Sequence, residues 1–274
     1  MKKLILALSI ALAAINAPAA TLAEAKASFN SGDHATAFPA FEEMAGAGDH
    51  EAEFYLGLMH YAGLGTKADK AAALEWFRKS AEAGNPKAQN NLGALYQKGD
   101  GVEQNYAEAM NWYGKAAEQG MGMAMQSIGY LYFKGEGVEQ SFDKAVEWWN
   151  KAAERGDSQA KFNLGLMYFS GKGVKADVGK GIKLWREAAE MGNAEAQSAL
   201  GNIFFNGTEV DQDFQAAYMW FRLATAFGRP GDDLKATMAA QRLKKKELDQ
   251  AEKEAQQKFE VIKAGLIKQQ QQDG

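Results

Sequence analysis

The chain has 274 residues, of which 31 are Lys or Arg and 35 are Asp or Glu, so its formal net charge is −4. This acidic balance argues against a general nucleic-acid surface, which needs basic side chains to neutralise phosphates. The absence of cysteine excludes disulfides, thiolate metal ligands and a cysteine nucleophile, and it argues against a lipid anchor on an N-terminal cysteine.

Residues 1–19 are predicted to be a signal peptide. Lys2 and Lys3 form a basic start, residues 4–14 are apolar, and residues 17–19 (Ala-Pro-Ala) supply the small-residue pattern of a cleavage site. We expect cleavage after Ala19 and a periplasmic or secreted mature chain. The alternative is an uncleaved membrane anchor, but the apolar run is shorter than the about 20 residues that a spanning helix needs.

Residues 22–50 are predicted to form a divergent first helical hairpin. Asp33, Ala37 and Phe41 have the spacing of the helix-capping, small and aromatic positions that recur farther along the chain. The connection between the two helices is shortened to Ser31-Gly32.

Residues 52–231 are predicted to contain five helical repeats of 36 residues. A branched residue followed by glycine recurs at this interval: Leu56-Gly57, Leu92-Gly93, Ile128-Gly129, Leu164-Gly165 and Leu200-Gly201. Residue types that cap a helix N-terminus recur at another position: Asp69, Asn105, Ser141, Asp177 and Asp213. Further glycines favour helix ends. Each repeat therefore predicts a helix A, a glycine loop, a helix B and a turn.

Helix B of each repeat has two adjacent positions that are mostly aromatic. The first holds Trp76, Trp112, Trp148, Leu184 and Trp220, and the second holds Phe77, Tyr113, Trp149, Trp185 and Phe221. A tryptophan cluster can form a carbohydrate site. Regular recurrence favours core packing instead, because one repeat can bury its apolar faces only against its neighbours.

The repeats resemble those of the Sel-one-like repeat (SLR) family, relatives of the tetratricopeptide repeats. The second repeat carries the family pattern most fully: Ala88, Asn91-Leu92-Gly93, Tyr96, Gly99, Gly101-Val102, Asn105, Ala109, Trp112-Tyr113, Ala116-Ala117 and Gly120. The resemblance is close over residues 52–231 and loose over residues 22–50. The last repeat departs from the pattern, with Glu209 in place of a loop glycine and Thr225 in place of an alanine. We expect a different conformation for that loop.

This resemblance implies an all-α, right-handed α-solenoid of helix-turn-helix repeats with helix A on its concave side. It also implies adaptor roles, such as assembling envelope complexes, regulating signalling receptors or contacting host factors. It does not identify the partner.

The resemblance further implies that a partner binds in the concave groove, at helix A positions that vary between repeats. We predict that the groove is lined by aromatic and lysine side chains: Phe54, Tyr61, Lys98, Tyr130, Phe133, Lys134, Phe162, Phe169 and Phe205. Aromatic residues in concave sites are frequent binding hot spots. The alternative is that a tight superhelix buries this aromatic stripe against the next repeat.

Residues 232–274 leave the 36-residue period and are predicted to cap the last repeat. Residues 233–243 and 247–268 favour helix, and Phe259, Ile262 and Leu266 share one face of the second helix. A solenoid end needs such a cap over its exposed core. We expect residues 269–274 to be disordered.

The sequence predicts no catalytic residue, no metal site and no cofactor. His60 takes a place that is Tyr or Phe in the other repeats, so we expect it to pack as an aromatic residue, whereas His34 and His50 are expected on the surface. The Gly-x-Gly at residues 99–101 lies between predicted helices. Without a preceding strand it has no dinucleotide-binding meaning.

We therefore expect a non-enzymatic scaffold or adaptor of the bacterial envelope, with a protein or peptide partner and no nucleic acid. One alternative is a binder of cell-wall or polysaccharide material that uses the groove aromatics. Another is a hydrolase of the β-lactamase type, because some cysteine-rich members of the family are associated with penicillin binding or hydrolysis. The absence of cysteine weakens that transfer.

Overall fold

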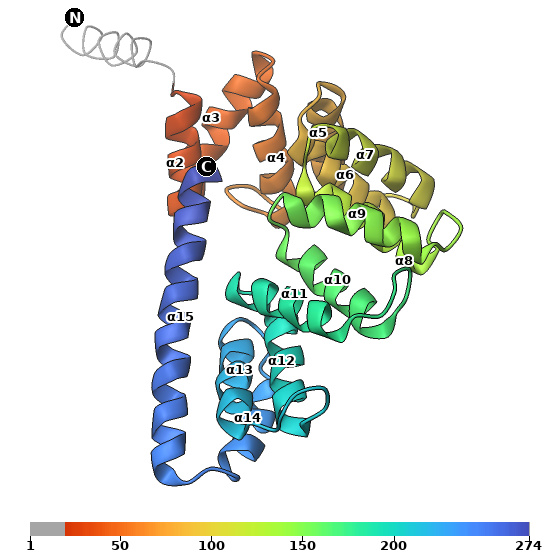
Figure 1. Cartoon of the computed structure of the whole chain (residues 1–274). Coiled ribbons are helices and arrows are strands. Elements are labelled where there is room, and N and C mark those ends of the chain that lie inside the picture. The colour runs from red at the N-terminus through yellow and green to blue at the C-terminus, as the bar shows by residue number, and fades with distance from the viewer. Residues whose placement is uncertain (1–19, 274) are drawn as a thin grey trace, which may run out of the picture. The chain divides into compact units, whose positions relative to one another are not determined.

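The computed structural model describes residues 20–273, and these form fourteen α-helices and no strand (Figure 1). The predicted signal peptide at residues 1–19 lies outside the described residues. The helices are α2 (Leu22–Ser31), α3 (His34–Gly46), α4 (His50–Ala62), α5 (Lys70–Glu82), α6 (Pro86–Lys98), α7 (Tyr106–Glu118), α8 (Gly122–Lys134), α9 (Phe142–Glu154), α10 (Ser158–Ser170), α11 (Val178–Glu190), α12 (Ala194–Asn206), α13 (Phe214–Ala226), α14 (Asp232–Ala240) and α15 (Lys245–Asp273). The predicted all-α class is confirmed.

The chain divides into two compact units, with the boundary between Ala116 and Ala117 within α7. In the first unit, successive helices from α2 to α6 pack on one another. In the second unit, α8 to α13 do the same, and both α14 and α15 pack on α13. The even-numbered helices α4, α6, α8, α10 and α12 are the A helices of the predicted repeats.

A close approach between helix A and helix B explains the recurring glycine in each repeat. A Cβ on Gly129 would lie 2.6 Å from the Trp149 ring, and one on Gly57 would lie 2.6 Å from Phe77. Glycines 93, 165 and 201 are equally close to the rings of Tyr113, Trp185 and Phe221. The aromatic ring of helix B thus lies directly on the backbone of helix A, where no larger residue fits.

The two adjacent aromatic positions of helix B differ in burial. The second position is buried in every repeat: Phe77, Tyr113, Trp149, Trp185 and Phe221. At the first position, Trp112 and Trp220 are buried, but Trp148 is only partly buried and lies under the Lys151 ammonium, 4.3 Å from the ring centroid. The core prediction therefore applies fully to the second position and only partly to the first.

The loop of the last repeat corrects an expectation from the sequence. Glu209 has a φ of 69°, in the left-handed region, and the equivalent Gly65, Gly101, Gly137 and Gly173 have φ between 67° and 75°. The loop thus keeps the conformation of the others although it lacks the glycine. Helices α12 and α13 on either side fix the path of the chain, so Glu209 adopts a backbone conformation that its side chain disfavours.

The C-terminal helix α15 runs beside α13 and covers the end of the second unit (Figure 1). Ala251, Ala255 and Ile262 are buried, and the Phe259 ring lies 5.3 Å from that of Phe227. The helix continues to Asp273, so the expectation of a disordered tail over residues 269–274 is wrong as far as Asp273. Glutamine is a good helix former, so the terminal glutamine run can extend a helix that packing has already nucleated.

Candidate binding groove on the A helices

One position of helix A holds Tyr61, Gln97, Phe133, Phe169 and Phe205 in the successive repeats. Its phenylalanine rings rest on helix B of the same repeat. The Phe133 centroid lies 5.6 Å from that of Trp149, and Phe169 stacks on Trp185 at 5.1 Å. Phe205 lies 5.5 Å from Phe214. All three phenylalanines are half-buried, so each ring has one side fixed by packing and keeps part of its surface open to solvent.

The other predicted residues of the second unit lie on the same helices. Tyr130 and Phe162 are half-buried, and the Lys134 ammonium lies 5.9 Å from the Tyr130 ring centroid. The Phe162 backbone carbonyl accepts a hydrogen bond from Trp185 Nε1 at 3.1 Å. Leu166, at the position of Tyr130 in the next repeat, is 39% exposed, which makes it a more accessible apolar residue than any of the predicted phenylalanines.

Phe54 does not lie on an accessible surface. It is 7% exposed, and its ring lies 6.0 Å from Phe77 and 5.5 Å from Tyr55 in the core of the first unit. Its prediction as a groove residue is therefore corrected. The equivalent position is Asn90 in the next repeat, and the apolar ring of Phe54 gains more from burial than from contact with water.

In the first unit, Tyr61 is held by a polar contact instead of an aromatic one. Tyr61 is 38% exposed, and its hydroxyl donates to Asp100 Oδ2 at 2.6 Å. Lys70 Nζ donates to Asp100 Oδ1 at 2.6 Å. These hydrogen bonds, from Lys70 first and then Tyr61, hold the pKa of Asp100 below its ordinary value. The hydrogen bond to Asp100 raises the pKa of Tyr61. Asp100 and Lys70 were not predicted from the sequence.

A pocket of about 200 Å³ lies between α4 and α6 on this face. Its walls are Leu58, Tyr61, Phe77, Asn91, Ala94, Leu95 and Lys98. Two of these, Tyr61 and Lys98, are predicted groove residues. The only sequence signal for the pocket is Ala94, the smallest residue at a position that holds Leu58, Tyr130, Leu166 and Asn202 in the other repeats.

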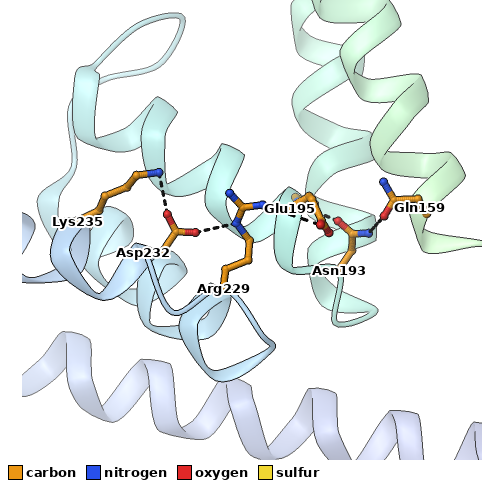
Figure 2. Close-up of polar contacts among 7 residues, drawn as sticks. Gln159, Asn193, Glu195, Arg229, Asp232 and Lys235 are labelled. Carbon is orange, nitrogen blue, oxygen red and sulfur yellow. Dashed lines mark hydrogen bonds and ion pairs between the residues drawn. The ribbon is translucent and has the colours of Figure 1, made fainter. Parts of the chain in front are cut away.

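A buried carboxylate links the start of α14 to the turn that precedes this helix (Figure 2). Asp232 is 2% exposed and lies between Lys235 Nζ at 2.7 Å and Arg229 Nε at 3.0 Å. Arg229 also approaches Glu195 at 3.9 Å. Burial alone would raise the pKa of Asp232, but hydrogen bonds from Lys235, Ser198 and Arg229 outweigh it and lower that pKa. With its charge matched on both sides, the cluster anchors the turn before α14.

The predicted histidine positions are partly confirmed. His60 packs edge-on to Phe38 at 5.4 Å, as expected for an aromatic substitute, and His50 is exposed. His34 is half-buried against Phe29 at 5.4 Å, so its predicted surface position is wrong. Across residues 20–273, no group of three His, Asp or Glu residues is arranged to hold a metal ion.

Two Ser-x-x-Lys sequences, the spacing found in serine β-lactamases, have structural roles here. Ser141 caps α9 by accepting a hydrogen bond from the Lys144 backbone N–H, and the Lys144 ammonium lies over the Tyr132 ring. In the sequence 158–161, Lys161 Nζ pairs with Glu187 at 2.8 Å. Within the described residues, the Lys144 ammonium thus contacts an aromatic ring and the Lys161 ammonium a carboxylate, and neither is hydrogen-bonded to the serine hydroxyl of its own sequence.

The helix pairs stack on one another, and in each pair an aromatic ring of helix B packs on a glycine of helix A. These features define an α-helical repeat protein of the tetratricopeptide type. A family model for the Sel1 repeat matches residues 50–85, 86–121, 122–157, 158–193 and 194–226. The chain therefore belongs to the Sel1 repeat family, and its fold is an SLR solenoid. No helix within the described residues is long and apolar enough to cross a membrane.

Two crystal structures are similar over most of the chain. One is a protective antigen of uropathogenic Escherichia coli with an SLR fold, at 38% identity and a TM-score of 0.74, covering 86% of this chain and 51% of the antigen. The other is a Sel1 repeat protein from Oxalobacter formigenes, at 31% identity and a TM-score of 0.75, covering 86% of this chain and 99% of that one. The chain thus spans about half the length of the antigen.

An immunity protein from Pseudomonas aeruginosa has the same fold at 18% identity and a TM-score of 0.55, covering 77% of this chain and 84% of that one. At this identity the likeness concerns the fold alone. No curated protein sequence matches the chain significantly.

Proposed function

We propose that this protein is a non-enzymatic scaffold that holds a partner polypeptide on the A-helix face of its repeats. The observation that carries the proposal is the way its groove rings are supported. Phe133 and Phe169 are half-buried, and each ring packs on a buried tryptophan of helix B in its own repeat. Rings fixed in this way lose little conformational entropy when a partner covers them.

Membership of the Sel1 repeat family supports this reading, because repeat solenoids offer extended surfaces for binding. Variation at the A-helix positions, on a framework whose core positions recur, suits recognition of one particular partner. We propose a role outside the cytoplasm for this chain, on the basis of the signal-like residues 1–19.

Site-specific photocrosslinking in the source organism tests the binding face. A photoreactive phenylalanine analogue would replace Tyr130 or Leu166 on the A-helix face and, as matched controls, Lys144 or Lys183 on exposed parts of B helices. We expect both A-helix positions to give an adduct with the same protein and the control positions to give none. Equal adducts from all four positions would contradict a groove site. Cosedimentation with purified peptidoglycan in the absence of any protein adduct would favour the glycan alternative.

Export is tested by the intact mass of the protein isolated from its own cells. We expect a mass lower than that of the full chain by about the first nineteen residues. A mature protein that begins at Met1 would contradict export by a cleaved signal.

A further inference from the structure

We propose that the pocket between α4 and α6 is a subsite for one apolar side chain of a partner peptide, next to an acidic residue of that peptide. The inference rests on the proposed function, because it assigns a ligand chemistry to one part of the binding face. It concerns the first unit alone.

The pocket is built into the repeat framework. Its floor is Phe77, which is 2% exposed and lies on the backbone of Gly57. Leu58 on α4 and Leu95 on α6 form apolar walls. The space between them is open because Ala94 projects only a methyl group where two other repeats have leucine. The pocket therefore follows from one small residue on a fixed scaffold.

The size of the pocket decides the class of ligand. Small-molecule and cofactor sites occupy roughly 300–1,000 Å³, and this pocket of about 200 Å³ is smaller. An apolar cavity of roughly 150 Å³ is enough to hold a benzene ring. The pocket therefore fits a single leucine, methionine or phenylalanine side chain, as expected of an anchor point within a longer peptide contact.

One wall of the pocket is fixed before any ligand binds. The Tyr61 hydroxyl and the Lys70 ammonium both donate to the Asp100 carboxylate, each at 2.6 Å. Asp100 lies in the loop after α6, so this contact connects the end of α4 to the next repeat loop. A wall held at both ends requires little ordering on binding, which favours affinity.

Charge selects the residue beside the anchor. Lys98 is exposed at the pocket wall, and among the described residues no carboxylate lies within 4.0 Å of its ammonium. Lys98 and Asp100 act on each other electrostatically, but the two oxygens of Asp100 already accept hydrogen bonds from Tyr61 and Lys70. The ammonium is therefore open to a carboxylate of the peptide. Such an exposed pair contributes more to selectivity than to affinity.

The test uses the full chain and three synthetic ten-residue Gly/Ser peptides. Each carries one leucine followed by Asp, Asn or Lys, and binding is followed by the methyl NMR signals of Leu58, Ala94 and Leu95. We expect saturable shifts with the Leu-Asp peptide, several-fold weaker binding of the Leu-Asn peptide and the weakest binding of the Leu-Lys peptide. The absence of saturable shifts at these three methyl-bearing residues would overturn the proposal.

Two variants separate the apolar and charged parts. Ala94→Leu fills the pocket with the residue that Leu58 and Leu166 place at the same position, and it should weaken the Leu-Asp peptide at least tenfold with an unchanged melting temperature. Lys98→Gln should remove the preference for Asp over Asn while leucine-dependent binding remains. Lys87→Gln, at another exposed lysine of α6, is the control and should change neither.

Unchanged peptide binding by Ala94→Leu, or an unchanged Asp preference in Lys98→Gln, would overturn the proposal. If Ala94→Leu fails to fold, the Lys98→Gln result decides it alone. Partner crosslinks from Tyr130 and Leu166 without peptide shifts at Ala94 would reject the pocket and leave the scaffold function intact. Peptide shifts at Ala94 without those crosslinks would support the pocket and contradict the proposed partner-binding face at Tyr130 and Leu166.

Discussion

The A-helix faces of the two units use the same positions but support their aromatic residues differently. In the second unit, Phe133 and Phe169 lie on buried tryptophans of helix B. In the first unit, Tyr61 is held at its hydroxyl by the loop residue Asp100, and the next A helix has a pocket at Ala94 instead of a ring. The same repeat framework thus presents an apolar stripe in the second unit and a pocket lined by Lys98 in the first. The difference comes from changes at variable positions alone.

The largest expected effect comes from removing a tryptophan that supports the stripe. Trp149→Ala deletes a side chain that is 2% exposed and should lower the free energy of unfolding by about 3–5 kcal/mol. Its neighbour provides a matched comparison, since Trp148 is half-buried under Lys151 and Trp148→Ala should cost about 1–2 kcal/mol. Urea denaturation of both variants measures the difference. Equal losses would show that the two positions do not differ in burial as described.

The stripe itself should affect binding more than folding. Phe133→Ala combined with Phe169→Ala removes two half-buried rings, so each should cost only about 1–2 kcal/mol of stability, while capture of the crosslinked partner should be lost. Thermal unfolding and partner capture are measured on the same preparation. If the double variant is folded and retains full capture, the partner does not bind at Phe133 and Phe169.

The two carboxylate clusters should respond differently to mutation and pH. Asp232 is buried between Lys235 and Arg229, so Asp232→Asn should cost about 1–3 kcal/mol. Asp100 is half-buried at the surface, and Asp100→Asn should scarcely change stability but should loosen Tyr61 and weaken the Leu-Asp peptide a few-fold.

The sign of the pH effect follows from the lowered pKa of Asp232. A carboxyl whose pKa is depressed by folding stabilises the protein above its unfolded pKa, and the contribution is lost as the pH falls through the folded value. The stability difference between wild type and Asp232→Asn should therefore be constant above the ordinary pKa of 3.8 and shrink at lower pH. A difference that grows on acidification would contradict this assignment.

The smallest expected effect compares the repeat loops of the two units. Glu209 occupies the left-handed region at φ 69°, which costs a side-chain-bearing residue about 1–2 kcal/mol. Glu209→Gly relieves this strain, but glycine loses more backbone entropy on folding, which costs about 0.5–1 kcal/mol. The free energy of unfolding should therefore rise by at most about 1 kcal/mol. Gly101→Ala, the reverse change at the matching loop of the first unit, should destabilise. Chemical denaturation measures both, and a loss from Glu209→Gly would mean that the Glu209 side chain contributes a compensating contact.

The candidate site was predictable in outline and not in its details. The repeat register located Tyr61, Lys98, Phe133 and Phe169 on the A helices, because positions 36 residues apart occupy equivalent places in a repeat. The register could not show that Phe54 is buried, since that depends on neighbouring rings from α4 and α5. Nor could it show that Asp100 reaches Tyr61, 39 residues away in the chain.

The amino-acid sequence by itself determined the helices, their caps and the repeat, because these depend on local residue types and on a period that recurs five times. It also marked the glycines on which the helix B rings rest. Only the tertiary structure decided which of the two adjacent aromatic positions is the core. Successive residues on a helix point about 100° apart, so Trp148 and Trp149 cannot both face helix A. The same packing forced Glu209 into a glycine conformation and left a pocket at Ala94, because the space around a side chain depends on neighbouring helices and not on the local sequence.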